Sequence, residues 1–170
     1  LDLDDTLPFD RIVSVGMFEH VGKDQIQGYF RKMRGLLAPG GLCLLHTLTK
    51  RAEGPINPWM QKHIFPGGYL PTLRELTAEL DALDFHTLHV ESLRRHYART
   101  LEHWHARFSA PETLGKVRAM FGEPFTRMWS LYLRMAGAYL RNGSIDVHQL
   151  VFSKGINDTL PMTLADIYQE

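Results

Sequence analysis

The sequence contains little that would suit a secreted, membrane-spanning or nucleic-acid-binding protein. Cysteine occurs once in 170 residues, as Cys43 in an apolar run, so no internal disulfide can form and a reducing compartment is expected. No apolar run approaches the ~20 residues of a membrane-spanning helix, and no signal peptide opens the chain. Basic and acidic residues balance at 19 each, so no net charge favours nucleic acid. We therefore expect a cytoplasmic protein with at most a peripheral membrane contact.

Several short enzyme motifs are also missing. There is no His-Glu-x-x-His pattern, and His103 and His105 stand two residues apart on an expected helix, where their side chains diverge. No metal site is expected for that reason. A nucleophile elbow is absent, which disfavours a histidine-based hydrolase. No glycine-rich phosphate loop opens a helix, because Gly40-Gly41 ends one.

What is present is an α/β pattern. Phe9–Val15 is a short β-branched run, and Leu42–Leu48 is nearly continuously apolar, so both are expected to be buried strands. Between them, Asp24–Leu37 carries apolar residues at helical spacing and is stopped by Pro39-Gly40-Gly41. Strand, helix and strand in this order predict a βαβ unit with parallel strands.

The rest of the chain alternates helices with two further strands. The Gly- and Pro-rich connection of residues 49–71 predicts a lid or binding loop, with a short helix near Trp59–Ile64 and with Trp59 and Phe65 as candidate lid residues. Helices are expected at Thr72–Leu83, Tyr97–Phe108, Glu112–Phe121 and Glu123–Leu140, and strands at Phe85–Leu93 and Asp146–Lys154.

Polar side chains follow the two parallel strands at the edge where ligands of open α/β sheets bind. Glu19 and His20 lie between Gly16 and Gly22, directly after the first strand, and His46 lies near the end of the second. Glu19 and His46 are expected to approach each other. The generic pattern alone favours another interpretation, in which Glu19 caps the next helix and His46 is a satisfied core histidine.

Several longer segments occur in an order that is specific to one family. The first reads Phe-Asp-Arg-Ile-Val-Ser-Val-Gly-Met-Phe-Glu-His-Val-Gly. The others are Leu44–Thr47, Ile64–Pro71, Tyr97–Leu101 followed by Trp104, Tyr132–Arg134 and Gln149–Ser153. Together these segments resemble the cyclopropane-fatty-acid synthases and mycolic-acid cyclopropane synthases, and the resemblance covers nearly the whole chain.

The resemblance implies a fold that this chain only partly contains. The expectation is an α/β structure, the C-terminal part of a Rossmann-like, seven-stranded class I methyltransferase fold with an inserted helical acyl-pocket region. Residues 1–170 would be the C-terminal portion of a single methyltransferase domain. The family's glycine-rich cofactor loop and ribose-binding acidic residue belong to earlier strands that are absent from this chain. The chain alone is therefore expected to bind cofactor poorly and to be inactive.

The resemblance also implies a reaction. The methyl group of S-adenosylmethionine passes to a cis double bond of an unsaturated phospholipid acyl chain, and loss of a proton from the resulting carbocation closes a cyclopropane ring. A bound bicarbonate would take that proton. The resemblance assigns its holders as Glu19, His46, Tyr97 and the backbone of Leu48.

Further expectations follow from the same resemblance. The S-adenosylmethionine side of the pocket is assigned to Val15, Gly16 and His20. Ala136 stands where some family members carry a cysteine, so that thiol has no role here. The protein would work at the inner face of the membrane. By analogy with members of this family, it could form a homodimer.

Three questions stay open from sequence. Arg94, Arg95 and Arg99 could touch phospholipid head groups, although a solvated basic face is favoured. The product could be a methyl-branched chain in place of a ring. Alternatively, the chain could be a non-catalytic lipid-binding or interaction module.

Overall fold

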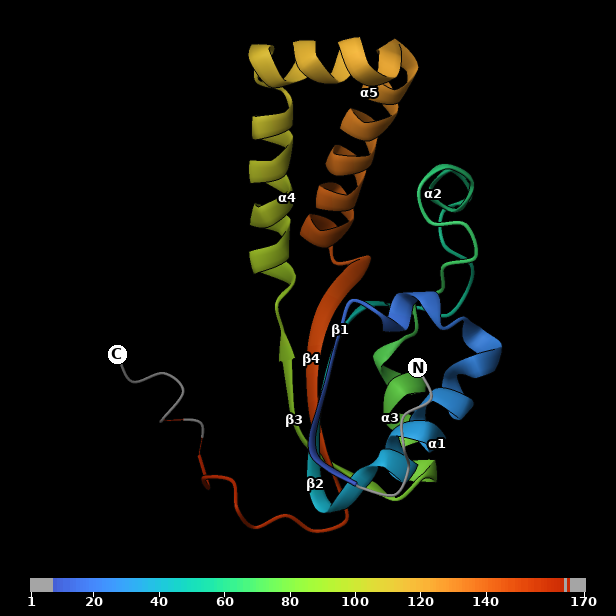
Figure 1. Ribbon diagram of the computed structural model, residues 1–170, viewed down its shortest axis with the longest axis vertical. Helices are drawn as coiled ribbons and strands as arrows, with labels where there is room; N and C mark the ends of the chain where they lie inside the picture. The colour runs from blue at the N-terminus through green and yellow to red at the C-terminus, as the bar shows by residue number, and fades with distance from the viewer. Residues whose placement is uncertain (1–7, 164, 166–170) are drawn as a thin grey trace.

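The computed structural model describes residues 8–163 and 165, and its centre is a four-stranded mixed sheet (Figure 1). The strands are β1 (Phe9–Val15), β2 (Leu37–Lys50), β3 (Phe85–Ser92) and β4 (Ile145–Lys154). They lie in the order β1-β2-β4-β3. β1 and β2 are parallel, whereas β4 runs antiparallel to both of its neighbours. The expected βαβ unit at the start of the chain is thus confirmed.

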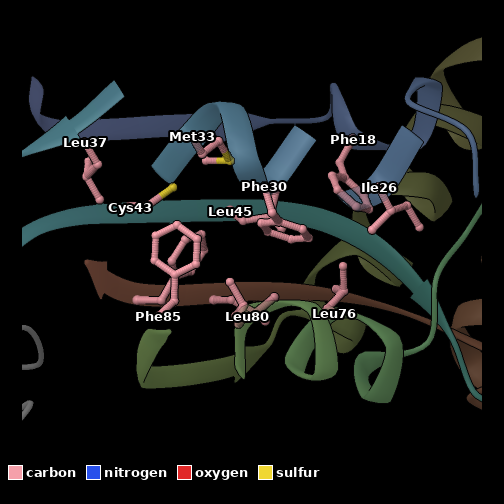
Figure 2. Packing of buried hydrophobic residues seen from close by; sticks show 12 residues of the cluster. Phe18, Ile26, Phe30, Met33, Leu37, Cys43, Leu45, Leu76, Leu80 and Phe85 are labelled. Atoms are coloured by element: carbon pink, nitrogen blue, oxygen red, sulfur yellow. The ribbon is translucent and has the colours of Figure 1, made fainter. Parts of the chain in front are cut away.

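Two helices cover one face of this sheet. They are α1 (Ile26–Leu36) and α3 (Leu73–Ala82), which lie side by side against β2 and β4 (Figure 1). Figure 2 shows apolar side chains from α1, α3 and β2 meeting in one layer, with Phe30, Leu45 and Leu80 fully buried. Burying side chains of this size is worth roughly 1.5–3 kcal/mol each, so this layer holds the sheet and helices together.

The second helical layer is a hairpin that projects beyond one end of the sheet (Figure 1). It consists of α4 (Arg94–Phe108) and α5 (Pro111–Asn142), which pack on each other around Ala98, Leu101 and Leu133. α5 is interrupted at Gly122, where φ is 81° and ψ is 172°. The two helices expected from sequence are therefore confirmed, with the break at the residue that separates them.

The long connection after β2 leaves the sheet and carries the short helix α2 (Pro58–His63) beside the hairpin (Figure 1). Asn57 caps this helix, because its Oδ1 accepts hydrogen bonds from the amides of Trp59 at 2.9 Å and Met60 at 3.3 Å. None of the helices in the described part of the chain is long and apolar enough to cross a membrane.

Two element boundaries differ from expectation by more than two residues. β2 begins at Leu37, directly after α1, because Leu37 already pairs with Phe9; the next pair joins Arg11 to Leu42, so Pro39 and the glycines form an irregular bulge inside the strand. α4 begins at Arg94, before Tyr97, where the Arg94 guanidinium donates to the carbonyl of Leu140 at 2.6 Å. Contacts between distant segments decide both boundaries.

Candidate active site

The site lies at the carboxyl ends of β1 and β2. Gly16 follows β1 with a φ of 66°, a left-handed conformation that favours glycine, and its amide donates to the carbonyl of His46 at 3.0 Å. The chain then forms a short 3₁₀ turn, Phe18–His20, in which Phe18 is buried in the core. With Phe18 buried, the neighbouring Glu19 is held beside the end of β2.

The carboxylate of Glu19 is the centre of this arrangement. Its Oε1 accepts a hydrogen bond from the backbone amide of Leu48 at 2.7 Å. Its Oε2 is buried and has no hydrogen-bond partner among the described residues. Glu19 does not cap the following helix, because neither the turn at Lys23–Gln25 nor α1 has a side-chain cap. The capping interpretation is therefore wrong, and a buried carboxylate oxygen without a partner calls for a functional explanation.

His46 lies near the end of β2, two residues before Leu48, and does not line the cavity that Glu19 borders. It sits between Val15 of β1 and Gln149 of β4 in the sheet, and its Nδ1 lies 3.2 Å from Nε2 of Gln149. Because an amide nitrogen only donates, Nδ1 accepts and the hydrogen resides on Nε2. The imidazole is half-buried and partnered, as the core-histidine interpretation expects, while its Nε2–H remains a donor.

Tyr97 joins the site from α4. Its side chain lines the same cavity as Glu19 and packs edge-on against Trp104, with ring centroids 6.1 Å apart. Burial raises the pKa of Tyr97, and the nearby Glu19 carboxylate raises it further. The phenol therefore stays protonated at neutral pH and can act as a hydrogen-bond donor.

The cavity shared by these residues has a volume of about 850 Å³. Its apolar wall comes from the helical hairpin and the lid loop, and the residues that form it include Phe65, Leu101, Tyr132, Ala136 and Tyr139. Phe65 meets Tyr132 edge-on with ring centroids 5.8 Å apart, and Asn57 donates to the Tyr139 hydroxyl at 3.0 Å. The lid loop therefore closes directly onto α5. Trp59, the other candidate lid residue, does not line the cavity.

A polar wall completes the cavity. Lys50 and Tyr69 line it, and the Lys50 ammonium lies 4.8 Å from the centroid of the Tyr69 ring. The Tyr69 hydroxyl donates to Glu75 at 2.5 Å, while its amide donates to the carbonyl of Glu19 at 3.2 Å. Burial lowers the pKa of Lys50, and Glu75 opposes that change. Tyr69 thus links the end of the lid loop to the turn that carries Glu19.

Of the three residues assigned to the S-adenosylmethionine side, two line the cavity and one does not. Gly16 and His20 line the cavity. Val15 does not, and its side chain is 62% exposed on edge strand β1. Open space surrounds the position of a side chain at Gly16, so within this chain its φ explains the glycine better than close packing does.

Some cavity residues had no role assigned from sequence. Lys50 and Arg51 fall in the expected loop, where charge alone says nothing about a binding wall. By contrast, Tyr132 and Tyr139 belong to the helix expected at Glu123–Leu140; their rings could line an acyl tunnel, although most aromatic rings of this kind belong to the core. Burial raises the pKa of Tyr132 to about 12, and Tyr97 adds to that shift. The Asn57-Pro58 pair is the signal that could have located the start of α2.

The fold is that of the S-adenosylmethionine-dependent methyltransferases. The structure of mycolic acid cyclopropane synthase CmaA1 complexed with SAH and CTAB matches 90% of this chain and 57% of that chain, with a TM-score of 0.80 and 32% identity. The structure of cyclopropane synthase MmaA2 from Mycobacterium tuberculosis matches 87% of this chain and 56% of that chain, with a TM-score of 0.79 and 31% identity.

The family follows from the sequence match. The family model described as mycolic acid cyclopropane synthetase matches residues 1–150, and the chain belongs to this family. It is 37% identical over 166 residues to the cyclopropane-fatty-acyl-phospholipid synthase of Escherichia coli strain K12, covering 94% of this chain and 41% of that protein. It is 36% identical over 170 residues to a probable fatty acid methyltransferase of Pseudomonas putida, covering 95% of this chain and 43% of that protein. The chain therefore spans less than half of either of these relatives.

Proposed function

We propose that the protein containing this chain transfers the methyl group of S-adenosylmethionine to a cis double bond of an unsaturated phospholipid acyl chain and closes a cyclopropane ring. One observation carries the proposal: the buried, unpartnered Oε2 of Glu19 beside a cavity with a largely apolar wall. An acyl chain needs such a wall, and a cationic transition state needs a nearby negative charge.

Glu19 has two functions in this proposal. Its Oε1 is fixed by the Leu48 amide, so the carboxylate keeps one orientation at little entropic cost during the reaction. Its Oε2 offers an acceptor to a proton-bearing group in the cavity. Tyr97 supplies a donor from α4, because its raised pKa keeps the hydroxyl protonated.

The site has groups that suit a bicarbonate ion. When bound, bicarbonate would supply the base that takes the proton in ring closure. Glu19 would accept the ion's own hydrogen through Oε2, and Tyr97 would donate to one of its oxygens. His46 does not line the cavity, so we propose that it reaches the ion only through Nε2–H, the ring nitrogen that is not next to Gln149. The Leu48 amide already donates to Glu19, so we propose that it orients the carboxylate and does not contact the ion.

We propose that the cofactor-binding strands are supplied outside these residues and complete one methyltransferase domain beside β1. β1 is the edge strand of the sheet, and Val13 and Val15 are 68% and 62% exposed on it, as expected for a strand face that another layer covers. Gly16, His20 and Val15 would then face the adenosylmethionine. The protein would act from the cytoplasm on the inner face of the membrane; a homodimer stays a prediction.

Product analysis tests the proposal. The protein expressed from its complete reading frame is incubated with labelled S-adenosylmethionine and with phospholipid vesicles that carry cis-unsaturated chains. The acyl chains are then analysed by mass spectrometry. We expect the gain of one CH₂ with loss of the double bond. Detection of a saturated methyl-branched chain would contradict ring closure and support the alternative methyltransferase reaction. Absence of label from lipid would favour a non-catalytic lipid-binding module.

A further inference from the structure

The outward face of α4 carries a continuous row of cations. Arg95, Arg99, His103 and Arg107 follow one another at four-residue spacing, and each is exposed. Residues four apart lie one above the other on a helix, so the row extends about 18 Å along α4. Tyr97 and Leu101, which line the cavity, lie on the opposite side of the same helix. α4 therefore separates a cavity wall from a basic outer surface.

Among the described residues, no acidic side chain pairs with the arginines of this row. Within residues 8–163, none of Arg95, Arg99 and Arg107 forms an ion pair or a side-chain hydrogen bond. Glu102, the single acidic residue of α4, is engaged by Arg141 of α5 at 2.6 Å. Arg94, which precedes the row, is also occupied, since it donates to the carbonyl of Leu140. In a chain with no net charge, this is a local concentration of positive charge.

An apolar element adjoins the cations. Trp104 is 40% exposed and forms a shallow surface groove of about 330 Å³ together with Thr100, His103 and Arg107. Tryptophan beside arginine is characteristic of surfaces that meet the boundary between lipid head groups and acyl chains. An acidic protein would pair with these charges equally well, but it would not account for the exposed indole ring of Trp104 beside them.

We propose that the outer face of α4, formed by Arg95, Arg99, His103, Trp104 and Arg107, docks on the anionic phospholipid surface of a membrane. The guanidinium groups contact head-group phosphates, and the Trp104 ring lies at the interface. This inference rests on the proposed function, because an enzyme that modifies phospholipid acyl chains must meet a membrane surface. Binding and methyl transfer are nevertheless measured separately.

The test compares two triple variants of the protein expressed from its complete reading frame. One carries Arg95→Gln, Arg99→Gln and Arg107→Gln. The matched control carries Arg31→Gln, Arg74→Gln and Lys116→Gln, which removes the same charge from exposed positions on α1, α3 and α5. Co-sedimentation is measured with vesicles of phosphatidylcholine alone and of phosphatidylcholine with phosphatidylglycerol. Circular dichroism verifies that both variants fold.

Each membrane-bound cation contributes about fivefold to affinity, so the α4 variant should bind anionic vesicles roughly a hundredfold more weakly, and the control nearly as wild type. Transfer to detergent-dispersed lipid should be unchanged in both variants. Equal binding by the two variants would overturn the proposal, as would wild-type protein that ignores anionic vesicles. Absence of transfer with intact vesicle binding would instead contradict the proposed function alone.

Discussion

The carboxylate of Glu19 accepts a hydrogen bond of 2.7 Å from the backbone amide of Leu48, although 29 residues separate the two in sequence. The bond joins the turn after β1 to the end of β2, and leaves the second carboxylate oxygen buried and free. Because the amide belongs to the sheet, the orientation of the carboxylate follows from the parallel pairing of two strands. The site is therefore fixed by the fold before any ligand enters.

Tyr97→Phe should lower kcat by about tenfold to a hundredfold while leaving S-adenosylmethionine binding nearly unchanged. The phenyl ring keeps the contact with Trp104, so only the donor hydroxyl is lost. Steady-state kinetics and calorimetric titration measure the two effects. The control is Tyr139→Phe, which removes a hydroxyl from the same cavity beside Asn57. Similar losses of kcat in both variants would deny Tyr97 a specific role.

Ala136→Leu should weaken binding of a long-chain lipid analogue about tenfold, because Ala136 lines the acyl cavity and the larger side chain would occupy part of it. Ala138→Leu provides the control, since Ala138 is exposed on the same helix. Fluorescence titration with analogues of two lengths measures the effect. If the two variants bind the long analogue equally well, the cavity is not the acyl site.

Ala136→Cys should leave turnover within about twofold, because the small thiol fits the same space.

Alkaline pH should destabilise the fold partly through Cys43. Burial raises the pKa of its thiol from 9.0 to about 12 in the folded protein. The unfolded chain loses this proton near the ordinary pKa while the folded chain retains it, so stability is full below about pH 9 and declines as pH rises toward 12. Cys43→Val should show a shallower loss of Tm between about pH 8 and about pH 10. Thermal melts monitored by circular dichroism decide this, and parallel slopes would contradict it.

Thr72→Ala should lower the free energy of unfolding by about 1 kcal/mol. The Thr72 hydroxyl accepts a hydrogen bond from the Glu75 amide at 3.1 Å, and the Glu75 carboxylate accepts one from the Thr72 amide at 2.7 Å; the two bonds form a capping box at the start of α3. Thr77→Ala is the control, because that hydroxyl bonds only to carbonyls within α3. Urea unfolding measures both, and an equal or larger effect of Thr77→Ala would refute the capping role.

Local pattern was sufficient for most of the fold. The β-branched run of β1 and the glycine between the two parts of α5 were read correctly because each depends on neighbouring residues. The start of β2 was not, since Leu37 joins the sheet through pairing with Phe9, a contact between distant segments. Periodicity cannot reveal such long-range pairing.

The candidate site divides in the same way. Glu19 and Tyr97 were named from sequence and share one cavity. His46 was expected to face the same centre, yet it pairs with Gln149 of β4, a strand 103 residues away in sequence. Lys50 looked like an ordinary loop cation, and its place beside Tyr69 depends on how the lid folds back on the sheet.

The most direct test of the account is the effect of Glu19→Gln on turnover compared with cofactor binding. The amide oxygen can still accept from Leu48, but an NH₂ donor replaces the buried acceptor that we assign to the reaction. We expect kcat to fall by roughly a hundredfold to a thousandfold and the Kd for S-adenosylmethionine to change less than about threefold. Glu53→Gln, on an exposed carboxylate paired with Arg74, should leave both values unchanged. Equal losses of turnover and cofactor affinity in Glu19→Gln would contradict the role given to this carboxylate.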